Sequence, residues 1–200
     1  MTQLHVKKAA VLGAGVMGAQ IAAHLANAGV PVILFDLAAR EGDKNGIVKK
    51  ALDGLKKLDP APLASKAVLK YIDAANYDEH LPLLADCDLI IEAIAERMDW
   101  KNDLYAKIAP FLASTAIIAS NTSGLSINAL AQGLPTDVQP RFCGIHFFNP
   151  PRYMRLVEII GTETTDAATL DALETWLTSH LGKGVVRAFD TPNFIANRIG

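Results

Sequence analysis

The sequence predicts an α/β fold with a doubly wound, mostly parallel sheet and helices on both faces. Three observations lead to this prediction. Short apolar runs without helical periodicity recur along the chain, as in strands that are buried on both faces. Segments with apolar residues at helical spacing separate several of these runs. A glycine-rich turn at residues 13–18 joins the first apolar run to the first helical segment.

Residues 7–36 are predicted to form a strand, a tight turn, a helix and a second strand. The first strand covers residues 9–12, and Gly13, Gly15 and Gly18 follow it. In a nucleotide-binding turn of this spacing, the first glycine allows a sharp turn, the second lets a pyrophosphate approach the backbone, and the third allows close helix packing. The free N–H groups at the start of the helix would face the phosphates.

The second strand, residues 32–35, ends on Asp36, which lies 23 residues after Gly13. A dinucleotide-binding fold has an acidic residue at this distance, and it accepts hydrogen bonds from the adenosine ribose. The same carboxylate would repel a 2′-phosphate, which favours NAD over NADP. The pattern therefore predicts a Rossmann-type domain with NAD as its cofactor.

Composition excludes several other classes. The chain has 200 residues, 50% hydrophobic and 20% charged, with a net charge of −2, so it lacks the basic character of a nucleic-acid-binding protein. No signal peptide and no membrane span is predicted, and a cytoplasmic location is expected. Cys87 and Cys143 lack metal-ligand spacing, so we expect buried free thiols and no metal site.

Residues 38–80 differ from the rest of the chain and are predicted to form a helical pair that projects between strands. An amphipathic helix is expected at 46–58 and a second helix at 63–71. Among the lysines of the first helix, Lys50 and Lys57 are candidates for phosphate contacts. A solvated helix face is the alternative.

Beyond this region, buried strands are expected at residues 87–94, 116–119, 156–160 and 184–189, and helices at 98–112, 125–131 and 167–181. Glu96 and Ser123 follow the ends of two strands, where open α/β sheets bind ligands. Ser123 is also a candidate cap for the helix at 125–131. Lys101 lies in a first helical turn, which favours acids, so an anionic ligand would explain it.

His146 and Glu158 are the candidates for acid–base chemistry. They are separated by 12 residues, and a strand, a turn containing proline and a returning strand can set them against each other. A carboxylate beside a histidine fixes its tautomer and stabilises the imidazolium. The other four histidines lack such a partner and are expected to be structural: His5, His24, His80 and His180.

Six motifs together resemble the 3-hydroxyacyl-CoA dehydrogenase family, including the dehydrogenase part of bacterial fatty-acid β-oxidation proteins. They are Gly-Ala-Gly-Val-Met-Gly (13–18), Ile-Glu-Ala-Ile-Ala-Glu (91–96), Ala-Ser-Asn-Thr-Ser (119–123), His-Phe-Phe-Asn-Pro (146–150), Leu-Val-Glu (156–158) and Asp-Thr-Pro-Asn-Phe-Ile-Ala-Asn-Arg (190–198). The resemblance implies that NAD oxidises the 3-hydroxyl of an acyl-CoA.

The resemblance also implies individual roles. His146 matches the catalytic base and Glu158 its partner, while Ser123 and Asn197 match groups that position the substrate and its reacting oxygen. The region at 38–80 matches an arm that touches coenzyme A, with Lys50 and Lys57 as its expected contacts. The expected cofactor contacts are Gly13, Gly15, Met17, Gly18, Asp36, Glu96, Lys101, Ser123 and Asn149.

The expected domain organisation is an NAD-binding domain at 1–190, followed at 191–200 by the start of a C-terminal helical domain. Phe194, Ile195 and Ile199 would then be exposed. The full-length protein is expected to be a homodimer or part of a multifunctional β-oxidation protein. Two alternatives remain: a β-hydroxyacid or sugar-acid dehydrogenase, and a non-enzymatic, crystallin-like NAD-binding relative.

Overall fold

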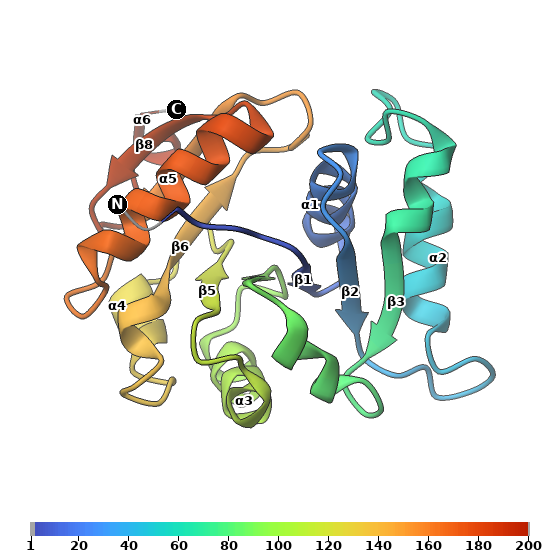
Figure 1. Ribbon diagram of the computed structural model, residues 1–200, viewed down its shortest axis with the longest axis horizontal. Coiled ribbons are helices and arrows are strands. Elements are labelled where there is room, and N and C mark those ends of the chain that lie inside the picture. The colour runs from blue at the N-terminus through green and yellow to red at the C-terminus, as the bar shows by residue number, and fades with distance from the viewer. Residues whose placement is uncertain (1–2, 200) are drawn as a thin grey trace.

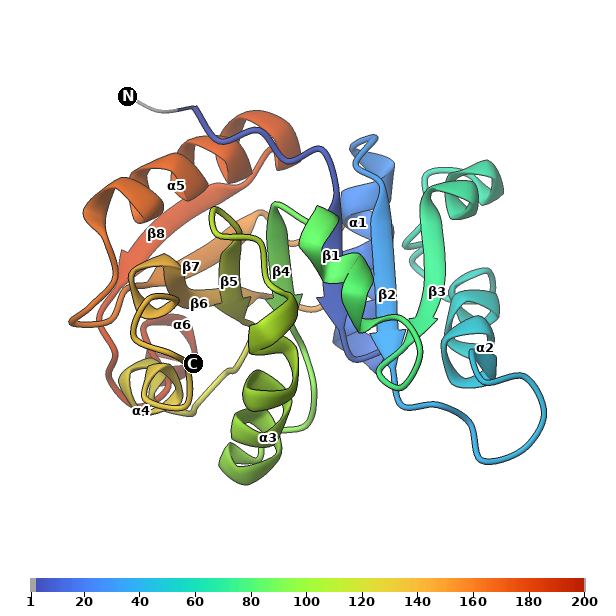
Figure 2. The ribbon, with the colours of Figure 1, turned by 60° about the horizontal axis from the view of Figure 1, so that its bottom comes forward.

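The apolar runs form one eight-stranded sheet in the computed structural model, which describes residues 3–199. The strand order is β3-β2-β1-β4-β5-β6-β7-β8, and the strands follow one another in this order across Figure 2. All neighbouring strands are parallel except β6 and β7, which are antiparallel. The predicted fold class is therefore confirmed. The strands are β1 (Ala9–Leu12), β2 (Val32–Asp36), β3 (Ile72–Asn76), β4 (Leu89–Glu92), β5 (Ile117–Ser120), β6 (Phe142–Phe147), β7 (Leu156–Ile160) and β8 (Gly184–Ala188).

Helices cover both faces of the sheet (Figure 1). On one face, α1 (Val16–Asn27), α2 (Gly46–Leu55) and α5 (Ala167–Leu181) pack on an apolar cluster that includes Ala9 and Val11. On the other face, α3 (Met98–Ile108) and α4 (Ile127–Ala131) pack on a cluster that includes Ala10 and Leu12. Successive strand residues thus serve opposite faces. The remaining helical segments are η1 (Lys66–Tyr71), η2 (Leu81–Asp86), η3 (Ala109–Phe111), η4 (Gln139–Arg141) and α6 (Ala196–Ile199).

The predicted helical pair at 38–80 is wrong in part. Only α2 is an α-helix; the second helix is the short 3₁₀ segment η1, and residues 72–76 form strand β3. Val48 and Leu55 of α2 are buried in the cluster beneath α1. Residues 38–80 therefore connect β2 to β3, and α2 packs against one face of the sheet. Strand β3 is the edge strand next to β2.

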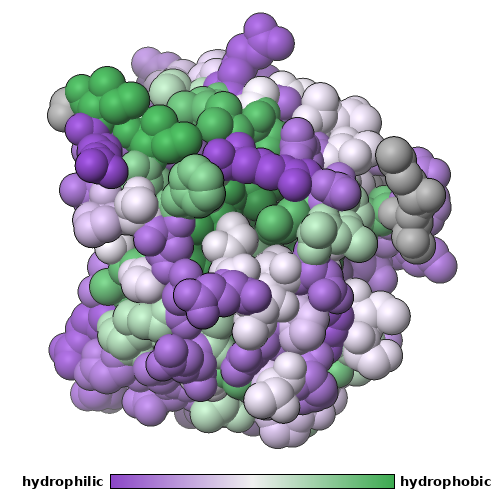
Figure 3. Space-filling view, turned by 90° about the vertical axis from the view of Figure 1, so that its left-hand side faces the viewer, coloured by the Kyte–Doolittle hydropathy of each residue, from purple (hydrophilic) through white to green (hydrophobic). Residues whose placement is uncertain are grey.

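Of the three apolar residues expected to be exposed near the end of the chain, the prediction is wrong for Phe194. Ile195 and Ile199 are 37% and 80% exposed, but Phe194 is only 2% exposed. Its ring packs edge-on against His146, with ring centroids 5.8 Å apart. Figure 3 shows an apolar area on the side of the molecule that carries β8 and α5. Val186 of β8 and Phe189 directly after it are also exposed.

Both cysteines are buried free thiols, as predicted. Burial raises the pKa of Cys87 and of Cys143 to about 12, mainly because an apolar environment disfavours the thiolate. Within residues 3–199, no helix combines the length and apolar character needed to cross a bilayer.

His24 lies in the last turn of α1, and both of its ring nitrogens are buried without a hydrogen-bond partner in the described part of the chain. Burial, followed by the positive charges of Lys183 and Arg152, lowers its pKa from 6.5 to about 4. Between these values the unfolded chain binds the proton more readily than the folded protein, so stability falls as the pH falls.

We expect acidification from pH 7 to pH 4 to lower the free energy of unfolding by up to about 3 kcal/mol through His24. Urea unfolding across this range measures the effect. His24→Leu should remove this part of the pH dependence, whereas His180→Gln, at an exposed position of α5, should leave it intact. Equal pH dependence in the wild type and His24→Leu would contradict the assignment.

Candidate cofactor and catalytic sites

The glycine turn after β1 has the geometry of a phosphate-binding turn. Gly13 has φ +105°, and a Cβ there would lie 2.8 Å from the carbonyl oxygen of Ala93. A Cβ on Gly18 would lie 1.8 Å from the carbonyl oxygen of Gly13, so α1 closes directly onto the turn. At Gly15 a Cβ would meet no atom within 4 Å, which leaves open space beside the backbone. The sharp turn at Gly13 and the close packing at Gly18 are therefore observed, whereas cofactor contacts by Gly13, Gly15 and Gly18 stay predictions.

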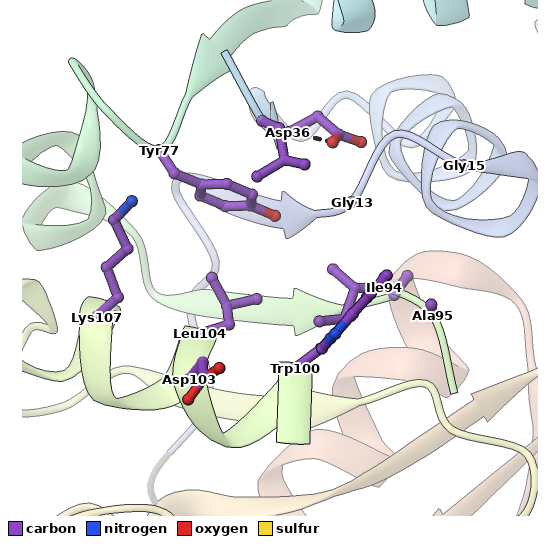
Figure 4. A pocket seen from close by; sticks show the side chains of 12 residues that line it. Gly13, Gly15, Asp36, Tyr77, Ile94, Ala95, Trp100, Asp103, Leu104 and Lys107 are labelled. Atoms are coloured by element: carbon purple, nitrogen blue, oxygen red, sulfur yellow. Dashed lines mark hydrogen bonds between the residues drawn. The ribbon is translucent and has the colours of Figure 1, made fainter. Parts of the chain in front are cut away.

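Asp36 lies at the end of β2 and holds the turn. Its Oδ2 accepts a hydrogen bond from the N–H of Ala14 at 2.6 Å, and its Oδ1 accepts one from Leu37 at 2.7 Å. Each oxygen retains a lone pair for a ribose hydroxyl. Gly13, Gly15 and Asp36 line a cleft of about 530 Å³ at the carboxyl ends of β1 to β4 (Figure 4). The cleft also includes Leu37, Tyr77, Ala93, Ile94, Ala95, Trp100, Asp103, Leu104 and Lys107. A nucleotide cofactor fits these residues.

Lys101, an expected cofactor contact, is buried beneath the cleft. It is 1% exposed, and its Nζ donates to Oε1 of Glu92 at 2.6 Å. Glu92 is fully buried at the end of β4 and also accepts from Tyr105 Oη, Ser120 Oγ and the backbone N–H of Ile94. The Glu92 carboxylate therefore accounts for the unusual position of Lys101 without a bound anion. A cofactor contact by Lys101 stays a prediction.

Glu96 and Ser123 meet between the ends of β4 and β5. Oε1 of Glu96 accepts from the backbone N–H and the Oγ of Ser123, at 2.6 and 3.1 Å, and its Oε2 accepts from Thr122 Oγ1 at 2.6 Å. The prediction that Ser123 caps the following helix is wrong: the cap of α4 is Ser126, whose Oγ accepts from the N–H of Ala129. Ser123 is thereby free to contribute to the site with Glu96.

His146 and Glu158 lie directly opposite each other in the antiparallel pair of β6 and β7. The Nδ1 of His146 is 2.7 Å from Oε2 of Glu158, and both side chains are buried. The rings of Phe148 and Phe194 pack on the imidazole, with centroids 4.4 and 5.8 Å away. The Nε2 has no hydrogen-bond partner within residues 3–199. This arrangement can take up or release a proton at Nε2.

The second oxygen of Glu158 holds the segment that carries Asn197. Oε1 accepts from the backbone N–H groups of Ile195 and Ala196, at 3.0 and 2.8 Å. Asn197 follows in α6 and is exposed. The carboxylate thus connects the imidazole to the start of α6, a link that the sequence analysis did not predict.

A second cleft, of about 650 Å³, lies between α1, α2 and the turn after β6. Asn149 and Pro150 line it, and the Oδ1 of Asn149 accepts from Gln20 Nε2 at 3.2 Å. Gly54 also lines it. Lys50 lies four residues before Gly54 on α2, and Lys57 lies in the turn after α2, where its N–H donates to the carbonyl of Gly54 at 3.0 Å. His146 lines neither this cleft nor the first one.

Met17, an expected cofactor contact, is partly buried and packs against the core beneath α1, so its cofactor contact stays a prediction. In the described part of the chain, no group of three or more His, Cys, Asp or Glu side chains could hold a metal ion.

Comparison with known proteins shows the family to which the chain is similar. The family model described as the NAD binding domain of 3-hydroxyacyl-CoA dehydrogenase matches residues 8–191. A putative fatty acid oxidation complex trifunctional enzyme of Rickettsia felis is 45% identical over 199 residues, covering 99% of this chain and 28% of that protein. A probable 3-hydroxyacyl-CoA dehydrogenase of Deinococcus radiodurans is 44% identical over 198 residues, covering 98% and 57%.

Solved structures give the same result. A 3-hydroxybutyryl-CoA dehydrogenase from Escherichia coli K12 superimposes with a TM-score of 0.83 at 35% identity, covering 98% of this chain and 41% of that one. This chain therefore spans less than two thirds of the length of each of these three proteins.

Replacing Lys101 by Met should leave the Glu92 carboxylate buried without its counter-charge. We expect the free energy of unfolding to fall by about 3–5 kcal/mol, as for other broken buried ion pairs. Chemical denaturation measures this loss. Lys107→Met is the matched control, because Lys107 is on the same helix but about half exposed, and should cost less than about 1 kcal/mol. Unchanged stability of Lys101→Met would contradict the structural role.

Proposed function

Because this chain belongs to the 3-hydroxyacyl-CoA dehydrogenase family, as its NAD-binding domain, we propose that the full-length protein oxidises the 3-hydroxyl of a 3-hydroxyacyl-CoA to the 3-oxo group. The observation that carries this proposal is the contact of 2.7 Å between His146 and Glu158, with Nε2 unengaged within the described residues. A role in fatty-acid β-oxidation is supported by the name of the Rickettsia felis relative.

NAD⁺, held in the cleft at Gly13, Gly15 and Asp36, would supply the acceptor for the hydride from C3 of the substrate. His146 takes the hydroxyl proton at Nε2, because Nδ1 is engaged with Glu158. Glu158 accepts from Nδ1–H, which holds the lone pair on Nε2 and stabilises the imidazolium that forms. Phe148 and Phe194 limit the access of water to the ring.

Ser123 and Asn197 position the reacting hydroxyl in this proposal. The Ser123 hydroxyl donates to Glu96 in this structure. After rotation it can donate instead to the substrate oxygen, whose own proton goes to His146. The amide of Asn197 supplies N–H donors for the oxygen as it becomes a carbonyl. The hydrogen bonds from Ile195 and Ala196 to Glu158 support this role, because they hold the start of α6 next to His146.

The second cleft is proposed to take the coenzyme A portion of the substrate. Support comes from Lys50 and Lys57, which make no ion pair within residues 3–199. Lys49 and Lys56 of the same region are neutralised by Asp43 and Asp53. Unpaired lysines beside a cleft are suited to the phosphates of coenzyme A.

We also propose that a further domain of the longer protein covers the exposed apolar side of Figure 3 and completes the site around His146. The exposure of Phe189 and Ile199, at 86% and 80%, supports this arrangement. The relatives of greater length support it as well. The whole protein is accordingly proposed to be a homodimer or one part of a multifunctional enzyme.

The chemistry is tested by His146→Gln in the full-length protein. General acid–base catalysis contributes about 10²- to 10⁴-fold, so kcat should fall on that scale while NAD⁺ still binds. Acetoacetyl-CoA reduction and its reverse measure the rates. Turnover close to that of the wild type in a folded His146→Gln protein would refute the mechanism.

The coenzyme A contact is tested by the double variant Lys50→Ala/Lys57→Ala. The KM for acyl-CoA should rise, most strongly at low salt because exposed charges are screened by added ions. The KM for NAD⁺ should not change. Lys49→Ala/Lys56→Ala is the matched control, with the same loss of charge from the same region, and it should leave both constants unchanged. Equal effects of the two double variants would exclude a specific contact.

A further inference from the structure

The hydroxyl of Tyr77 is a buried polar group that lacks an acceptor within residues 3–199. Tyr77 is 5% exposed, and the nearest backbone group to its Oη is the N–H of Gly13, which can only donate. Native proteins pair nearly all such groups, so each exception needs an explanation. The residue is also held firmly: its ring stacks on Phe35, with centroids 5.9 Å apart, and its N–H donates to the carbonyl of Asp36 at 3.1 Å.

The hydroxyl is directed into the cleft beside the glycine turn. Tyr77 follows β3 and lines this cleft together with Gly13 and Asp36. Figure 4 shows the ring lying across the cleft, with its oxygen pointing toward the region between the glycine turn and Leu104. Burial, followed by the charges of Asp36 and Glu92, holds the pKa of Tyr77 well above its usual range. The phenol is therefore a neutral O–H donor in need of an acceptor.

The position of Tyr77 directly after β3 indicates which part of the cofactor it meets. Four strands lie between β3 and β6, the strand that carries His146, so the two are separated by five inter-strand distances. At about 4.8 Å for each distance, the carboxyl ends of β3 and β6 are about 24 Å apart. The hydride must be exchanged near His146, so the opposite end of an extended dinucleotide lies toward β2 and β3. Asp36 marks the same end through its capacity to accept hydrogen bonds from ribose.

We propose that Tyr77 is an additional binding residue for the adenosine half of NAD, and that its hydroxyl donates a hydrogen bond to an adenosine oxygen or nitrogen. Asp36 and Tyr77 then act as a complementary pair, because the carboxylate accepts from the ribose and the phenol donates to the nucleoside. The inference rests on the cofactor role within the proposed function. It adds a contact that neither the glycine turn nor the acid at the end of β2 provides.

The test uses Tyr77→Phe in the full-length protein, since this change removes only the hydroxyl. Calorimetric titration with NAD⁺ and with AMP should show that both bind roughly threefold to tenfold more weakly, as expected for one neutral hydrogen bond. The free variant should melt at the same or a higher temperature, because it no longer buries an unpaired hydroxyl. Tyr71→Phe, at a residue that is 41% exposed, should change neither quantity.

Three results would overturn the proposal: unchanged affinity of Tyr77→Phe for NAD⁺, weaker binding of NAD⁺ without weaker binding of AMP, or a lower melting temperature of the free variant. The last result would mean that the hydroxyl has a structural partner. Each is distinct from a failure of the proposed function, which would appear as normal turnover in His146→Gln or as absence of NAD⁺ binding in the wild type.

Discussion

The positions of Glu96 and Ser123 in the candidate site depend on one buried carboxylate, that of Glu92. It receives hydrogen bonds from the ammonium of Lys101, the hydroxyls of Tyr105 and Ser120, and the N–H of Ile94. These donors come from α3, from the end of β5 and from the loop after β4. A buried charge is tolerated only when it is paired and fully hydrogen-bonded, so the three segments must keep their relative positions. The loops that carry Glu96 and Ser123 start from this fixed point.

Glu158 performs a comparable task on the other half of the sheet. One of its oxygens contacts His146 and the other accepts from two backbone N–H groups at the start of α6. Asn193 and Phe194, just before, have φ values of 64° and 50°, a conformation that is costly for a bulky residue. Burial of Phe194 against the imidazole and the hydrogen bonds to Glu158 offset this cost. The carboxylate that orients the histidine therefore also orders the segment that carries Asn197.

Several of these features follow from local sequence rules. The βαβ unit at residues 7–36 could be predicted because its turn, strand and helix signals are all short-range. The pairing of His146 with Glu158 could be anticipated because two strands joined by a turn are set in register with each other. In both cases the relevant residues are close in the chain or belong to consecutive elements.

Other features depend on contacts that the sequence does not encode locally. Local rules do not predict strand β3, because Ile-Asp-Ala-Ala-Asn contains residues that are depleted in strands and only pairing with β2 makes the segment a strand. They also do not predict the partner of Lys101, because Glu92 is on the preceding strand and not on the same helix. A carboxylate that ends an apolar strand, with a lysine nine residues later, is the signal that would have identified the pair. Tyr77 gave no such signal, since its position depends on β3.

The first cleft and the surroundings of His146 lie on different halves of the sheet, and they differ in how much of their lining the described residues supply. The residues that line the first cleft lie between positions 13 and 107, and Asp36 is held there by hydrogen bonds from the N–H groups of Ala14 and Leu37. A cofactor can therefore be bound by this half through its own residues. His146 has neighbours on β7 and in the segment before α6, but it lines neither cleft. Phe194 packs on its ring, and the exposed residues Ile195 and Ile199 follow Phe194 in the chain. The geometry of the His146–Glu158 pair is thus set within the domain, and our proposal assigns the enclosure of the substrate to a further domain.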